Sequence, residues 1–396
     1  MAAVSELCDR LGVTTALDAA VGPIKQRDRG CSAGQLLTGI AAGQLAGEDF
    51  LAGLDRRDPG RGPHQALDAL TAGIMRKRVN WVLDADIRDF SGSLDRGWPE
   101  KFPRHRIADG RVLRLIGKWL AAGVIEDGKW AETRTGSPQG ASVSPLLASV
   151  YLHYVFDLRA DWRRSRSAHG DVIIVRRADD FIVGFEHKDD AGQFLEELRG
   201  RFAKFGLELH PGKTRLIEFG RHAARNRAAR GERRPETFGF PGFTHLCARS
   251  KNGRFRVRRI TISKRVRARL AEVKTETRRR AHQPLPVQGR WLASVLRGHM
   301  AYYAVPGSAH AVRVFRDQVT RQWLKALRRR SQKGRALTRA RMDRIQKRWL
   351  PPARTMHPFP EARFAAIHPR QEPSAVIPHA GICAGGRPQG RPLPRL

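Results

Sequence analysis

Residues 172–185 read VIIVRRADDFIVGF and contain two short apolar runs, 172–175 and 181–185, on either side of a polar segment. Runs of β-branched and aromatic residues that flank a short polar segment predict a β-hairpin with buried strands. The turn of this hairpin carries Asp179 and Asp180. Asp is common in turns for conformational reasons alone, so this pair does not by itself indicate chemistry.

The apolar stretch 81–87, WVLDADI, predicts another strand, and this strand carries Asp84 and Asp86. Adjacent strands of one sheet could bring Asp86 to the edge at which the hairpin turns. Several carboxylates at one edge repel one another unless cations lie between them, and Mg²⁺ prefers oxygen ligands of this kind. Two such ions can activate a 3′-hydroxyl and stabilise a pyrophosphate leaving group. The pattern therefore raises the hypothesis of a two-metal site.

Two further segments are weaker signals. Residues 136–145, GSPQGASVSP, predict a loop whose glycines let the backbone approach a ligand closely, but a plain connecting loop has the same composition. Residues 206–209, GLEL, precede Lys213, and a single lysine after a turn is usually only solvated.

The charge of the chain points to a polyanionic partner. The 396 residues include 74 Lys and Arg against 38 Asp and Glu, a net charge of +36. Residues 221–350 hold 36 Lys and Arg against six Asp and Glu, a net charge of +30. A region of this charge repels itself unless a polyanion such as nucleic acid screens it. An ordinary metabolic enzyme is therefore not the default expectation.

Other sequence features concern the cellular environment. No run of 18 apolar residues occurs, so we expect no transmembrane helix and no membrane partner. The first residues lack the layout of a secretory signal. The four cysteines are scattered without a metal-binding pattern, which predicts free thiols in a reducing cytoplasm.

Four segments in this order resemble the reverse transcriptases encoded by group II introns, which also act as maturases. They are ADI (85–87), GSPQGASVSPLLA (136–148), RADDFIVG (177–184) and FGLELHPGKT (205–214). Each is weak alone, but the four together in this order and spacing are specific. The resemblance begins near 60–64 and extends through 365, about three quarters of the chain.

The resemblance implies an α+β fold: a palm with an antiparallel sheet backed by helices, truncated fingers, and a basic helical thumb and maturase region. It implies an RNA-directed DNA polymerase of the bacterial cytoplasm that uses two Mg²⁺ ions. Its partners would be intron RNA, an RNA template, a DNA primer or target, and dNTP. The metal-binding catalytic residues would be Asp86, Asp179 and Asp180; Gln139 and Gly140 would line the nucleotide and template pocket, and Lys213 would lie near the leaving pyrophosphate.

The sequence departs from the family pattern near the expected site. Arg177 stands where the family has Tyr, and it adds a cation beside the catalytic carboxylates. Ser91 and Gly92 stand where the family has Phe and Asp, so the aromatic gate against ribonucleotides is missing. Ser149 replaces an expected Asn, and Pro241 replaces an expected Leu within what should be a strand, where Pro removes a hydrogen-bond donor. We therefore expect DNA synthesis to be weak or absent.

Residues 1–57 carry a net charge of −1 and do not resemble the fingers of these enzymes. They resemble instead the N-terminus of a DDE-type insertion-sequence transposase. The expected domains are 1–57 transposase-like, 58–235 palm with a fingers remnant, 236–365 thumb and maturase, and 366–396 a Pro- and Gly-rich tail that we expect to be disordered. Two alternatives stay open: a catalytically dead RNA-binding remnant, and a transposase-derived DNA-binding protein.

Overall fold

The computed structural model describes residues 11–21, 63–93, 97–105, 107–121, 124–126, 129–131, 144–330, 332–367 and 375–376. The chain forms two compact units, one made of residues 1–217 and 370–396 and the other of residues 218–369. Both combine helices with sheets that are mainly antiparallel, so the predicted α+β class is confirmed. Among the described residues, no helix is both long enough and apolar enough to cross a membrane.

The first unit is built on a five-stranded sheet in the order β10-β4-β5-β1-β6. Its strands are β1 (Trp81–Ala85), β4 (Val172–Arg177), β5 (Asp180–Phe185), β6 (Arg215–Glu218) and β10 (Ala375–Val376). The predicted hairpin is confirmed, because β4 and β5 pair antiparallel across a two-residue turn. β1 pairs antiparallel with β5. β10 pairs parallel with β4 and lies in the tail that the sequence predicts to be disordered.

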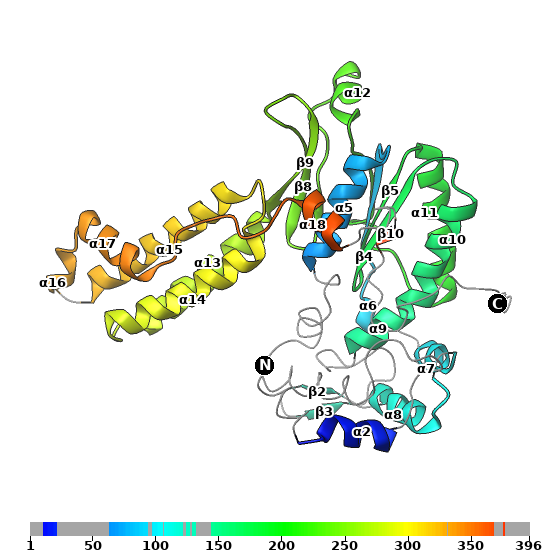
Figure 1. Cartoon of the computed structure of the whole chain (residues 1–396), viewed down its shortest axis with the longest axis horizontal. Helices are drawn as coiled ribbons and strands as arrows, with labels where there is room; N and C mark the ends of the chain where they lie inside the picture. Colours follow the sequence, from blue (N-terminus) through cyan, green and yellow to red (C-terminus); the bar gives the residue numbers. More distant parts are fainter. Residues whose placement is uncertain are drawn as a thin grey trace. The chain divides into compact units, whose positions relative to one another are not determined.

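Helices lie on both faces of this sheet (Figure 1). α5 (Pro63–Arg76) packs against β4. The other face carries α9 (Ser144–Leu152), a π-helix η1 (His153–Asp157), α10 (Leu158–Arg166) and α11 (Lys188–Lys204), which share one apolar core with the sheet. Alternate strand residues, such as Leu83, Ile174 and Val183, enter this core, as the two-residue period of a strand requires.

The remaining described elements of the first unit are short. They are α2 (Val13–Val21), α6 (Phe90–Ser93), α7 (Gly97–Arg104), α8 (Gly110–Ala121), β2 (Val124–Glu126) and β3 (Lys129–Ala131). α7 adds aromatic side chains to the core, where Phe102 stacks on Tyr154 with 4.7 Å between ring centroids.

The second unit has a three-stranded antiparallel sheet, which α12 precedes and the other helices follow. The strands are β7 (Phe238–Phe240), β8 (Phe243–Arg249) and β9 (Phe255–Thr261). The helices are α12 (Ala223–Ala229), α13 (Ser263–Arg279), α14 (Leu285–Tyr303), α15 (Ala309–Arg329), α16 (Gln332–Arg335), α17 (Arg339–Trp349) and α18 (Pro360–Ile367). Trp323 is fully buried in their core and donates its indole N–H to Gln288 Oε1 at 2.8 Å.

Pro241 lies in the turn between β7 and β8, so the prediction that it interrupts a strand is wrong. Gly242, the next residue, has φ +81°. A turn with Pro first and a residue of positive φ second is the arrangement that type II turns favour. Pro241 therefore fits its position, because no ladder hydrogen bond is needed there.

Candidate nucleotidyl-transfer site

The β4–β5 turn places Asp179 and Asp180 at one end of the sheet. Arg177 pairs with Asp180 across the hairpin, and Ala178 and Asp179 form the turn itself. Ala178 has φ +54°, a conformation that residues other than Gly rarely adopt. Such residues persist only where the surroundings hold them, and they cluster at functional sites. Both aspartates are exposed to solvent.

The register of β1 brings Asp86 to the same end of the sheet. Asp84 pairs with Ile182 and Ala85 pairs with Phe181. Continued one position beyond β1, this register sets Asp86 opposite Asp180. Paired positions of antiparallel strands lie on the same face, so this continuation sets Asp84, Asp86 and Asp180 on one face.

Two cations from the segment after α11 contact these carboxylates. Lys213 Nζ lies 2.7 Å from Asp86 Oδ2, and an Arg215 guanidinium nitrogen lies 3.0 Å from Asp84 Oδ2. The backbone fixes this segment, because the N–H of His210 donates to the Asp86 carbonyl at 2.8 Å. Lys213 therefore contacts a proposed metal ligand directly, which the sequence analysis did not foresee.

The environment of Asp84 differs from that of an exposed carboxylate. Burial raises the pKa of the Asp84 carboxyl above its ordinary value; the hydrogen bond and charge of Arg215 oppose this shift, and the charge of Asp86 adds to it. Asp84 is thus paired with Arg215, and Asp86, directly after β1, stays the residue that the sequence predicts as a metal ligand.

The carboxylate chemistry of this edge suits Mg²⁺, since Asp86, Asp179 and Asp180 offer only oxygen donors. Within the described parts of the chain, however, no group of three or more His, Cys, Asp and Glu side chains is arranged to hold a metal ion. Asp86 is turned instead to Lys213. The carboxylates would therefore have to draw together to hold a metal ion at this edge.

Arg176, which the sequence analysis did not single out, is the buried residue next to the turn. Its side chain is 2% exposed and pairs with Asp157, which is 1% exposed. Burial would raise the pKa of the Asp157 carboxyl, but the charge and hydrogen bonds of Arg176 outweigh burial and hold that pKa below its ordinary value. The sequence signal that could have identified Arg176 is a charged residue directly after the apolar run 172–175.

The structure places only some of the other positions that the sequence singles out. Gln139 and Gly140 lie outside the described residues. Ser91 and Gly92 fall in the short helix α6. Ser149 lies in α9 and is buried. The transposase-like segment is described only at 11–21, so its assignment stays a prediction.

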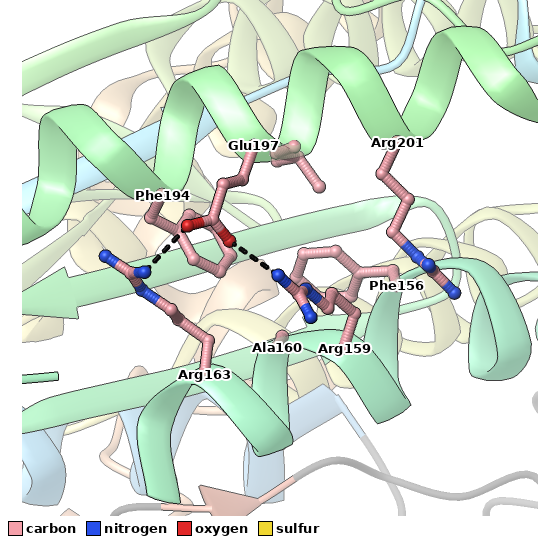
Figure 2. A pocket seen from close by; sticks show the side chains of 8 residues that line it. Phe156, Arg159, Ala160, Arg163, Phe194, Glu197 and Arg201 are labelled. Atoms are coloured by element: carbon pink, nitrogen blue, oxygen red, sulfur yellow. Dashed lines mark hydrogen bonds and ion pairs between the residues drawn. The ribbon is translucent and has the colours of Figure 1, made fainter. Parts of the chain in front are cut away.

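A cluster of ionic side chains joins α10 to α11 behind the sheet (Figure 2). Glu197 lies between two arginines, 3.1 Å from Arg159 and 2.7 Å from Arg163. The cavity beside them holds about 10 Å³, which is room for about one water molecule. This cluster therefore ties two helices together and offers no substrate site.

Basic side chains cover the helices of the second unit. The exposed Lys and Arg side chains of α13 are Lys264, Arg265, Arg267, Arg269, Lys274, Arg278 and Arg279. At the end of α15 an open hollow of about 540 Å³ is lined by Lys325, Arg328, Arg329, Gln332 and Arg335. Clusters of this kind bind phosphate backbones through charge, without reading sequence.

Comparisons with known proteins find similarity to reverse transcriptases over part of the chain. Residues 61–245 match the family of reverse transcriptases (RNA-dependent DNA polymerases). Over 95 residues the chain is 34% identical to the group II intron-encoded protein LtrA of Lactococcus lactis subsp. cremoris, covering 24% of this chain and 16% of that protein. It is 28% identical over 213 residues to the protein YkfC of Escherichia coli K12, covering 44% of this chain and 56% of that protein.

These matches span less than two thirds of either curated relative. Among solved structures, apo telomerase from Candida tropicalis superposes on 78% of this chain and 53% of its own, with a TM-score of 0.41 and 13% identity. The paired carboxylate strands and the matched family model fall on the same segment. The match to the reverse transcriptase family thus covers the segment that carries Asp86, Asp179 and Asp180.

Proposed function

We propose that the chain is an RNA-directed DNA polymerase and intron maturase of the group II intron type, with nucleotidyl transfer at Asp86, Asp179 and Asp180. The observation that carries this proposal is the antiparallel pairing of β1, which Asp86 directly follows, with β5, which begins at Asp180. The partial similarity to LtrA supports the intron-encoded class. The substrates would be dNTP, an RNA template and a DNA primer.

Two Mg²⁺ ions, when bound, would lower the pKa of the primer hydroxyl and neutralise the charge that develops on the leaving pyrophosphate. The protein would hold these ions with the three carboxylates. To do so, Asp86 must release Lys213, which now lies 2.7 Å from it. Once released, Lys213 is free to contact an anionic group such as pyrophosphate at the same edge.

The basic second unit would bind the RNA that the polymerase copies or the intron that it folds. Its exposed Lys and Arg side chains and the hollow on α15 supply positive charge over several helices. Binding should weaken steeply with salt, because each neutralised phosphate releases a condensed counterion. Intron RNA is the partner that the similarity to LtrA suggests.

We expect this polymerase activity to be weak. Arg177 lies opposite Asp180 in the backbone register of the hairpin, which sets a cationic residue beside the proposed metal ligands, where its guanidinium would compete with the metal. The contact of Lys213 with Asp86 acts in the same direction. These two observations favour a second candidate function, an RNA-binding protein that has lost polymerase activity.

Primer extension on an RNA template with Mg²⁺ separates the two candidates. The full chain is compared with Asp179→Ala, with Arg177→Tyr, and with Asp189→Ala. Asp189 is an exposed aspartate at the start of α11 and serves as the matched control. The polymerase is supported if the full chain extends the primer weakly. Asp179→Ala should then abolish extension, Asp189→Ala should preserve it and Arg177→Tyr should increase it. No extension by any variant, together with tight salt-sensitive RNA binding, supports the RNA-binding remnant.

A further inference from the structure

The guanidinium of Arg176 joins the catalytic turn to a buried carboxylate. Arg176 Nε and Nη2 donate to the two oxygens of Asp157 at 2.7 and 2.5 Å. The remaining terminal nitrogen, Nη1, donates to the carbonyl of Ala178 at 2.7 Å. One rigid side chain therefore sets the position of a turn carbonyl relative to Asp157.

The position of Asp157 depends on the π-helix η1, which it ends. A π-helix carries one extra residue per turn, and such turns occur frequently at functional sites. In a continuous α-helix each residue advances by about 100°, so one extra residue in a turn changes the facing of the residues beyond it by about that angle. The direction of Asp157 is therefore tied to the π-helical geometry of η1.

Arg201 of α11 supports the π-helix from its other side. Its Nε donates to the Val155 carbonyl at 2.5 Å and its Nη2 donates to the Tyr154 carbonyl at 2.9 Å. Figure 2 shows Arg201 extending from α11 beside Phe156. A series of contacts thus leads from α11 through η1 to Arg176 and the turn.

We propose that Arg176 is a positioning residue that, held by Asp157 of the π-helix, fixes the conformation of the Ala178–Asp179 turn and so the direction of the two catalytic carboxylates. The unfavourable φ of +54° at Ala178 is the reason that the turn needs such a contact. The catalytic part of this inference rests on the proposed function, whereas the control of the turn does not.

A purely structural role is the alternative, because a buried ion pair can serve only to join elements. Arg163 offers a matched control. It is also largely buried, at 10% exposure, and binds Glu197 at 2.7 Å and Gln193 at 2.7 Å, but it has no contact with the turn. Lys in place of Arg keeps the charge in both cases and removes the forked geometry.

Amide hydrogen exchange of the full chain, measured by mass spectrometry, tests the control of the turn. In Arg176→Lys we expect exchange across 177–181 to be about tenfold faster, which corresponds to about 1.4 kcal/mol of local stability. Arg163→Lys should leave exchange in this segment unchanged. Asp157→Asn, which removes the counter-charge of Arg176 and keeps one acceptor, should accelerate exchange in the same segment and provides a second readout.

The proposal would be overturned if exchange across 177–181 were unchanged in both Arg176→Lys and Asp157→Asn. It would also be overturned if Arg163→Lys accelerated exchange there equally. Primer extension then separates this inference from the proposed function. If the unmodified chain extends a primer, Arg176→Lys should lower kcat at least fivefold and leave KM for dNTP within twofold. If the unmodified chain shows no extension, the polymerase proposal fails, and the exchange result still decides whether Arg176 holds the turn.

Discussion

The most quantitative prediction concerns His245 and acid stability. His245 lies on β8, is fully buried and stacks on Phe238 with 4.8 Å between ring centroids and 4° between the ring planes. Its register partner on β9 is Arg259, which is also buried. Burial first, and the charge of Arg259 second, lower the pKa of His245 to about 3.

The pKa shift converts directly into a dependence of stability on pH. In the unfolded chain the pKa of a histidine is about 6.5. Between pH 6.5 and pH 3 the unfolded chain therefore binds a proton that the folded chain excludes, so acidification favours unfolding. At pH 5 the difference is about 1.5 pH units, and each unit corresponds to about 1.4 kcal/mol. His245 should thus lower the free energy of unfolding by about 2 kcal/mol between pH 7 and pH 5.

Urea unfolding of the full chain at pH 7 and pH 5 measures this loss. His245→Phe keeps the stacking on Phe238 and removes the titrating group, so its loss between the two pH values should be about 2 kcal/mol smaller than that of the unmodified chain. His310→Phe, at an exposed histidine of α15, is the control and should lose as much stability as the unmodified chain. Equal losses in all three chains would refute the reasoning, because His245 would then not stay neutral in the folded state.

Three further predictions follow from single contacts. Lys213→Met should tighten Mn²⁺ binding, measured by electron paramagnetic resonance, because the substitution removes the cation that contacts Asp86. A half-exposed ion pair contributes at most about 1 kcal/mol, so the gain in affinity should not exceed about fivefold. Weaker Mn²⁺ binding would contradict competition between Lys213 and the metal. Gly184→Ala should lower the free energy of unfolding by about 1–3 kcal/mol in urea, because the added Cβ would lie 2.7 Å from a buried isoleucine side chain. Trp323→Phe should lower the free energy of unfolding by about 1–3 kcal/mol in urea, because Gln288 Oε1 loses its hydrogen-bond donor in the core. An unchanged free energy of unfolding would mean that water replaces the indole N–H.

Local sequence patterns predicted the elements that depend on neighbouring residues. The β4–β5 hairpin follows from two apolar runs around RADD, because strand periodicity and turn composition are properties of a short segment. The location of Asp86 at the end of an apolar strand was visible for the same reason. The charge of +30 in 221–350 needs no structure at all, since charge is a sum over residues.

Contacts between distant segments required the tertiary structure. The Lys213–Asp86 pair joins residues 127 positions apart, and only the pairing of strands and loops determines which carboxylate a lysine reaches. The Arg176–Asp157 pair joins a strand to the last residue of a π-helix, and no marked composition in 153–157 indicates that helix type. Residue types and local periodicity thus determined the strands, the hairpin and the charge. The partners of each charged side chain were decided by packing, because burial and strand register select one neighbour from the many that the sequence allows.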